Sequence, residues 1–176
     1  MAAQNSDSTS DRLRVLPNVV IFLFCISPLL GIAQQNKKHA THSAVECDTT
    51  LWNHVWNPDR LEIISSCVTV TGRITESHKE SDGDLHLLLK PDGAFANTVN
   101  AVNTKEKNGC LVIEVICVGK SKETKEKIAC DDYKNHVYVP HKGERVRITG
   151  SLVKDLHHGW NEIHPVTKIK RIDPKG

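Results

Sequence analysis

The stretch Val68–Ile74 reads V-T-V-T-G-R-I, and its pattern returns in Val146–Leu152 as V-R-I-T-G-S-L. In both stretches apolar β-branched residues alternate with polar ones, Thr-Gly follows, and an apolar residue then resumes the alternation. A period of two indicates a half-buried β-strand. A glycine midway along a long strand lets the strand bend where a small closed barrel turns its corners. The two stretches therefore predict two long strands of a small all-β barrel.

Three other segments complete the predicted sheet. D-L-H-L-L-L-K alternates leucine with polar residues, C-L-V-I-E-V-I-C-V is short and apolar, and V-T-K-I-K-R-I resumes the period of two near the C-terminus. We expect strands at residues 61–75, 84–90, 110–118, 144–154 and 159–172. Residues 94–109 are predicted to be a loop, and residues 119–135 a charged excursion whose E-T-K-E-K segment is compatible with a short helix.

The N-terminus carries a targeting signal. Residues 1–14 are polar and end with Arg12 and Arg14, Val15–Ala33 is an apolar run, and Gly31 and Ala33 stand at positions −3 and −1 of a cut before Gln34. This pattern predicts a cleaved signal peptide over residues 1–33 and a secreted, extracytoplasmic protein. The run is also close to the ~20 residues that span a bilayer. An uncleaved anchor, with the domain outside, is therefore the alternative, and residues 15–33 would be its only membrane contact.

Residues 34–60 are predicted to be a polar linker and N-terminal extension, and residues 61–176 the barrel domain. The formal net charge is only +2, so the overall charge does not point to nucleic acid or an anionic membrane as a binding partner. Five of the six cysteines follow residue 33, and none forms a C-x-x-C pair. Disulfides are the default outside the cell. We predict Cys47–Cys67 and Cys117–Cys130, with Cys110 free and buried; other pairings of the five stay open.

Five strands, with long glycine-bent first and fourth strands and an excursion between the third and fourth, resemble the oligonucleotide/oligosaccharide-binding fold (OB-fold), a five-stranded Greek-key barrel. The resemblance is architectural and covers about residues 61–172. The combination of G-D-L-H, L-V-I-E-V and G-W-N-E-I-H-P-V is also similar to a group of exported microbial proteins of this kind. That second resemblance implies the fold but does not indicate any particular activity.

Asp155–Val166, D-L-H-H-G-W-N-E-I-H-P-V, is the richest candidate site. On a strand, Trp160, Glu162 and His164 share one face. In an OB-fold the third strand neighbours the second and the fifth, so the resemblance implies that Glu114 lies between His86 and the Glu162/His164 pair. Two imidazoles and two carboxylates suit zinc or another divalent metal, and they also suit general acid–base chemistry. The competing interpretation, which we favour, is a structural network that closes one end of the barrel.

The sequence favours a binding module over an enzyme, and no catalytic residue is assigned. Its ligand would be a small molecule, a glycan or a protein. The candidate ligand-binding residues are Trp160, Asn161, Glu162, His164, His86 and Arg147. The first alternative is a metal-binding or metal-dependent hydrolytic site at His86, Glu114, Glu162 and His164. The second is single-stranded nucleic-acid binding, which is not favoured because the chain is nearly neutral and poor in aromatic residues. No cofactor is predicted beyond the possible metal.

Overall fold

The computed structural model describes residues 46–121 and 129–172. The predicted signal peptide, most of the linker and the E-T-K-E-K segment lie outside the described residues. Within the described part of the chain, no helix combines the length and the apolar character that a membrane crossing requires.

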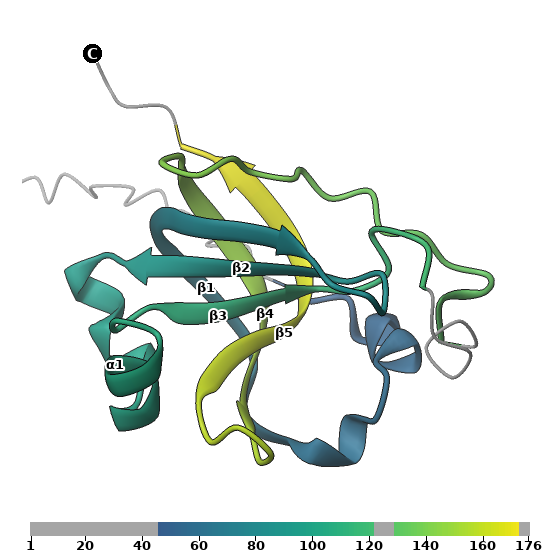
Figure 1. Ribbon diagram of the computed structural model, residues 1–176, viewed down its shortest axis with the longest axis horizontal. Coiled ribbons are helices and arrows are strands. Elements are labelled where there is room, and N and C mark those ends of the chain that lie inside the picture. The colour runs from purple at the N-terminus through teal and green to yellow at the C-terminus, as the bar shows by residue number, and fades with distance from the viewer. Residues whose placement is uncertain (1–45, 122–128, 173–176) are drawn as a thin grey trace, which may run out of the picture. The chain divides into compact units, whose positions relative to one another are not determined.

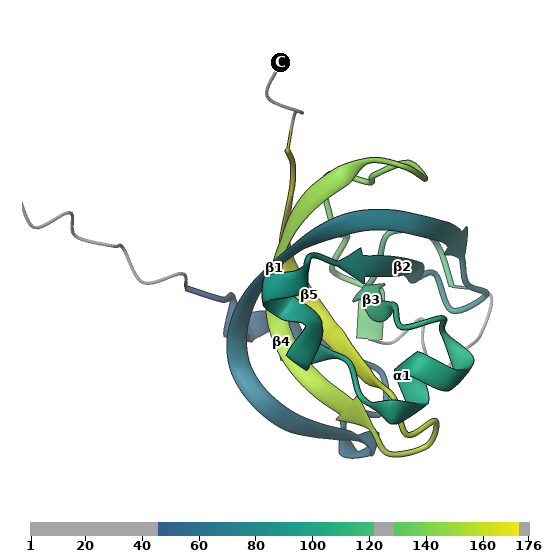
Figure 2. The ribbon, with the colours of Figure 1, turned by 90° about the vertical axis from the view of Figure 1, so that its left-hand side faces the viewer.

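Five strands form one sheet whose hydrogen bonds close in a ring (Figures 1 and 2). They are β1 (Leu61–Lys79), β2 (Leu85–Pro91), β3 (Leu111–Val115), β4 (Arg145–Asp155) and β5 (Asn161–Arg171). The order around the ring is β1-β2-β3-β5-β4. The β3–β5 contact is parallel, whereas the other four pairs are antiparallel. The sequence-based prediction of a five-stranded, mostly β domain is confirmed.

Two strand ends differ from the prediction by three residues or more. β1 continues to Lys79, beyond the predicted strand over residues 61–75, because His78 and Lys79 still pair with His86 and Leu85 of β2. β3 ends at Val115, and Cys117 has a φ of 57°, which turns the chain out of the sheet.

The predicted loop over residues 94–109 is wrong in part. It contains the 3₁₀ helix η3 (Gly93–Thr98) and the α-helix α1 (Ala101–Glu106). Asn100 caps α1 by accepting hydrogen bonds from the N–H groups of Val102 and Asn103, and the Asn103 side chain accepts from the N–H of Asn100. The helix lies beside the end of the sheet where β2 stops and β3 begins (Figure 1). Two further 3₁₀ helices, η1 (Thr49–His54) and η2 (Pro58–Arg60), precede β1.

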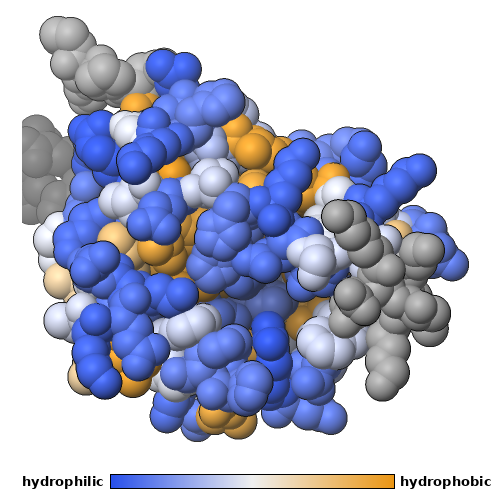
Figure 3. Space-filling model, viewed as in Figure 1, coloured by the Kyte–Doolittle hydropathy of each residue, from blue (hydrophilic) through white to orange (hydrophobic). Residues whose placement is uncertain are grey.

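The main core fills the ring with alternate residues of the strands. From β2, β3 and β5 it takes Leu85, Leu87, Leu89, Leu111, Ile113, Val115, Ile163, Val166 and Ile169. Hydrophilic side chains cover most of the face seen in Figure 3, with apolar side chains in small patches. Since side chains alternate along a strand, the residues between those of the core point outward. His86, Glu114, Glu162 and His164 all belong to this outer set.

Gly72 and Gly150 are required by close backbone approach. A Cβ on Gly150 would lie 2.5 Å from the carbonyl oxygen of Pro165, and a Cβ on Gly72 would meet the carbonyl oxygen of Lys90. The pairing of β4 with β5 shifts register on both sides of Gly150, which marks the bend in the strand. The two glycines that the repeated pattern singled out therefore stand where neighbouring strands pass too closely for a side chain.

Both predicted disulfides are present. Cys47 bonds to Cys67, which ties the N-terminal extension to β1, and Cys117 bonds to Cys130 after β3. Cys110 is free and buried, as predicted. Two disulfides fit an oxidising, extracellular location.

Candidate ligand and metal site

A polar cavity of about 320 Å³ opens on the outer face of β2, β3 and β5. The β1–β2 hairpin borders it on one side, and the β4–β5 connection borders it on the other. It is the place where the outward residues of three strands meet two connecting turns. Five of the residues predicted as site residues line it: His86, Glu114, Trp160, Glu162 and His164.

The strand register brings these side chains together. His86 of β2 lies opposite Glu114 of β3. The parallel pairs Val112–Glu162 and Ile113–Ile163 bring β3 beside β5, and Glu114 comes close enough to His164 for the two groups to interact electrostatically. Glu114 therefore lies between His86 and the β5 residues, as the OB-like strand order implied. Strand alternation links Glu162 with His164, whereas the order of the strands in the sheet brings His86 and Glu114 to them.

His164 and Glu162 form a buried pair. Glu162 Oε1 is 3.0 Å from His164 Nδ1, and the other carboxylate oxygen accepts a hydrogen bond of 2.9 Å from the Trp160 indole N–H. Burial lowers the pKa of His164, but the hydrogen bond and the charge of Glu162 outweigh it, so the pKa stands above its ordinary value. The second ring nitrogen of His164, Nε2, is buried and has no hydrogen-bond partner within residues 46–121 and 129–172. A buried polar atom without a partner is costly and calls for an explanation.

His86 and Glu114 form a second pair, with 2.7 Å between His86 Nδ1 and Glu114 Oε1. Burial is the main cause that raises the pKa of Glu114 well above its ordinary value. Burial, helped by the positive charge of Lys107, lowers the pKa of His86. Both shifts favour the neutral forms of the two groups, because a charge here has little access to water.

A third histidine–carboxylate pair orders the β4–β5 connection. Asp155 accepts hydrogen bonds from the backbone N–H groups of His157 and His158, and its Oδ2 lies 2.9 Å from His158 Nδ1. The His158 ring stacks on Trp160 with 4.1 Å between centroids. Lys107 Nζ lies 4.0 Å from the centroid of the same tryptophan, within cation–π range. The wall of the cavity formed by Trp160 is therefore held in place by its neighbours.

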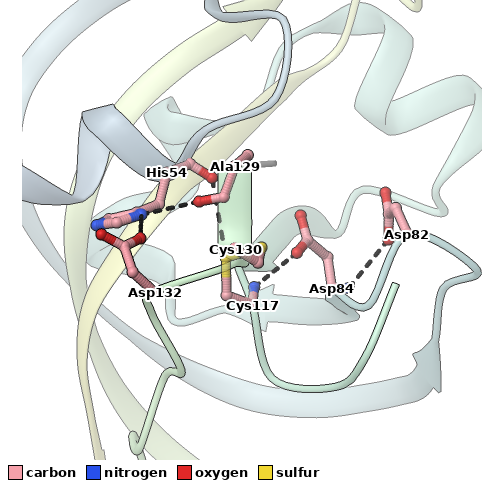
Figure 4. The surroundings of a disulfide bond; sticks show 7 residues. All are labelled: His54, Asp82, Asp84, Cys117, Ala129, Cys130 and Asp132. Atoms are coloured by element: carbon pink, nitrogen blue, oxygen red, sulfur yellow. Dashed lines mark hydrogen bonds and ion pairs between the residues drawn. A yellow bond between two sulfur atoms is a disulfide. The ribbon is translucent and has the colours of Figure 1, made fainter. Parts of the chain in front are cut away.

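Asp84, which the sequence analysis did not select, also lines the cavity. Figure 4 shows it between Asp82 and the Cys117–Cys130 disulfide. The backbone N–H of Cys117 donates to Asp84 Oδ1 at 2.7 Å, and the backbone N–H of Asp84 donates to Asp82 Oδ1 at 2.9 Å. Burial raises the pKa of Asp84 to about 6. The disulfide thus fixes the peptide group that holds this carboxylate.

Two predicted ligand-binding residues have other surroundings. Asn161 is buried, and its side chain accepts a hydrogen bond from Asn100 and donates one to the carbonyl of Thr98, so it joins β5 to the segment that leads into α1. Arg147 is exposed on β4 opposite Lys170, near the C-terminal end of β5, whereas the cavity lies at the beginning of that strand. The structure does not bring Arg147 to the cavity.

The four predicted metal ligands meet as two pairs. Within residues 46–121 and 129–172, they do not form a group of three ligand atoms lying within 4.8 Å of one another. Glu162 and Glu114 each hold the Nδ1 atom of a histidine, so their observed role is to orient the two imidazoles. A carboxylate on one ring nitrogen is the usual support of a metal-binding histidine, whose other nitrogen then binds the metal.

No family model matches the chain, and no curated protein matches it. The function of the cavity must therefore be inferred from its own residues.

Proposed function

We propose that the protein is an exported binding module of the OB type, and that its cavity takes a divalent transition-metal ion. The observation that carries the proposal is His164: the residue lines the polar cavity, Nδ1 is held by Glu162, and the buried Nε2 has no hydrogen-bond partner among the described residues. A metal bound at Nε2 would satisfy that atom. His86, backed by Glu114, offers a second nitrogen in the same cavity.

The OB assignment rests on the strand order and on the position of the cavity. OB barrels bind their ligands on the face of the second and third strands, between the connection of strands 1 and 2 and that of strands 4 and 5. Here the cavity has His86 from β2, Glu114 from β3 and residues from both of those connections. The position supports a binding function, while the chemistry of the lining selects the ligand.

The lining favours a cation. Besides Glu114, whose neutral form is favoured, five acidic side chains border the cavity, against one arginine and one lysine: Glu80, Asp82, Asp84, Asp155 and Glu162, with Arg60 and Lys107. Such a lining repels phosphate groups, whereas proteins that bind single-stranded nucleic acid present a positively charged groove. Imidazole and carboxylate together suit zinc-class ions. His164 and His86 would hold the metal, Glu162 and Glu114 would orient them, and the ion could polarise a bound water or ligand.

Elemental analysis tests the proposal. The exported protein, purified without a histidine tag and dialysed against metal-free buffer, should retain near-stoichiometric zinc or a similar metal. The Glu162→Gln/His164→Ala double variant should lose this metal during dialysis while keeping its far-UV circular dichroism. His157→Ala, which removes an exposed neighbouring histidine, should behave as the wild type. Absence of metal from the wild type, together with no uptake of added Zn²⁺, would overturn the proposal.

A further inference from the structure

The end of β1 carries further metal-binding atoms at the edge of the cavity. His78 pairs with His86 across β1 and β2, and the two rings stack with 4.7 Å between centroids. His78 Nε2 lies 2.9 Å from Glu80 Oε1. One ligand atom from each of His78, Glu80 and His86 lies within 4.8 Å of the other two. These three residues are called the mouth cluster below.

The mouth cluster runs from solvent into the cavity. The side chains of His78 and Glu80 are 52% and 41% exposed, whereas that of His86 is only 10% exposed. Two residues of the cluster are therefore open to solvent, and the third is buried. His86 is fixed by Glu114 on Nδ1, which leaves Nε2 as its single metal-binding atom.

The turn that follows β1 holds Glu80 near the two histidines. The backbone N–H of Glu80 donates to the carbonyl of Asp84 at 2.9 Å, and the N–H of Gly83 donates to the carbonyl of Glu80. Gly83 has a φ of 98°, a backbone conformation that glycine adopts readily. The backbone of Glu80 is thus set by the turn, and its carboxylate needs only a side-chain rotation to meet an incoming ion.

We propose that His78, Glu80 and His86 form a second binding site for a divalent transition-metal ion, at the mouth of the cavity. The site uses two imidazole nitrogens and one carboxylate oxygen, and it leaves a position open for water or a ligand, the pattern of catalytic zinc sites. It shares Nε2 of His86 with the cavity site proposed above, so the two sites hold an ion one at a time, but it does not need His164. An ion at the mouth cluster lies where metal from the solvent first reaches the cavity.

The alternative is a surface ion pair between His78 and Glu80, which would contribute little to stability. Three features distinguish the cluster from such a pair. A third ligand atom from a buried histidine lies within 4.8 Å. A buried carboxylate supports that histidine from behind. The cluster also borders a cavity lined by His164, whose buried Nε2 has no partner in the part of the chain that the structure describes.

Zn²⁺ titration of the dialysed protein, with a competing chromophoric chelator, tests the inference. In the His164→Ala background the mouth cluster is the remaining site and should bind one Zn²⁺ per chain. Adding His78→Ala or Glu80→Gln should weaken that binding by at least about tenfold, since even outer-shell changes commonly cost 10–100-fold. Adding His157→Ala should leave it unchanged. Both test residues of the cluster are exposed, so the fold is not at risk.

The outcomes separate the two proposals. Equal Zn²⁺ affinity of the His164→Ala chain with and without His78→Ala would overturn the mouth cluster and leave the cavity site standing. A wild type that retains no metal after dialysis, yet loses added Zn²⁺ binding on His78→Ala, would overturn the cavity site and support the mouth cluster.

Discussion

Glu162 and His164 lie two residues apart on the outer face of β5, joined by 3.0 Å between Oε1 and Nδ1, and both side chains are almost fully buried. Burial alone would leave the imidazole neutral at physiological pH. The carboxylate reverses that tendency, so the histidine pKa stands above its ordinary value of 6.5. A buried ion pair of this kind is favourable only when its hydrogen-bond geometry is good. Removing either partner destabilises the fold, because it leaves the other charge buried and unpaired.

Glu162→Gln should therefore lower the pKa of His164 below 6.5, because the effect of burial remains and the main opposing charge is removed. The measurement is an NMR titration of the His164 ring protons in the presence of a metal chelator. In the wild type the pair stabilises the fold fully below the unfolded pKa of about 6.5, and its contribution is lost as the pH rises through the higher folded pKa. Glu106→Gln, on the exposed side of α1, is the control. An unchanged His164 pKa in Glu162→Gln would contradict the assignment.

Asp84→Asn should stabilise the metal-free protein at neutral pH. The folded pKa of about 6 lies above the ordinary value of 3.8, so the folded state holds a proton that the unfolded state has lost. The contribution of Asp84 to the free energy of unfolding thus falls as the pH rises from about 4 to about 6. Asparagine keeps an oxygen for the N–H of Cys117 without the charge.

Urea unfolding from pH 4 to pH 7 measures this effect. Asp84→Asn should gain on the wild type as the pH rises, by at most about 2–3 kcal/mol at pH 7. Asp59→Asn, which changes an exposed carboxylate, should show no such trend. The same stability difference between Asp84→Asn and the wild type at pH 4 and pH 7 would rule out the raised pKa.

Asn103 is predicted to be among the costliest polar residues to remove. It is fully buried, its amide donates to the carbonyls of Cys110 and Asn161, and its oxygen accepts from the N–H groups of Asn100 and Asn161. Asn103→Ala should lower the free energy of unfolding by about 3 kcal/mol, because several buried backbone groups lose their partners. Asn53→Ala, on the exposed side of η1, should change it by less than about 0.5 kcal/mol. Equal effects of the two changes in urea unfolding would show that the network is not needed.

The network around Asn103 is also a feature of the fold that could not be predicted from the sequence. The strands follow from alternation, and the glycine bends follow from a repeated pattern, because both depend on residues close together in the chain. The outer set of His86, Glu114, Glu162 and His164 could be anticipated from strand parity and an OB-like order. Residues 94–109 contain four asparagines and look like a loop, however, and the hydrogen bonds from this segment to β5 span nearly sixty positions, with 58 separating Asn103 from Asn161.

The mouth cluster was missed for a related reason. Residues 75–83 are charged and polar, so local propensity predicts a turn. β1 continues because its last residues pair with β2, and this pairing sets His78 opposite His86. Arg147 shows the reverse error: it has suitable chemistry, yet its position along β4 places it beside the far end of β5. In both cases the pairing between strands set the position of the residue, and the residues near it in the sequence do not reveal that pairing.

Both disulfides should contribute to the stability of the fold. Their Cys–Cys sequence separations are 20 and 13, so the chain-entropy account gives each about 3 kcal/mol, within a usual 2–4 kcal/mol. Reductant should lower the melting temperature of the wild type and of Cys110→Ala alike. A chain with all four bridging cysteines changed to serine should not respond. A wild-type melting temperature that reductant leaves unmoved would contradict the assigned bridges.

Loss of the Cys117–Cys130 bond should also disturb the cavity, because the N–H of Cys117 holds Asp84 (Figure 4). Burial dominates the pKa of Asp84, and this hydrogen bond opposes it. If the bond loosens while the carboxyl stays buried, the pKa should rise further; if water enters, it should fall toward 3.8. Cys117→Ser/Cys130→Ser should therefore shift the NMR titration of Asp84 in one direction or the other. Cys47→Ser/Cys67→Ser, whose bridge ties the N-terminal extension to β1, should leave that titration unchanged. Identical titrations in the two variants would mean that the second disulfide stabilises the chain without positioning the site.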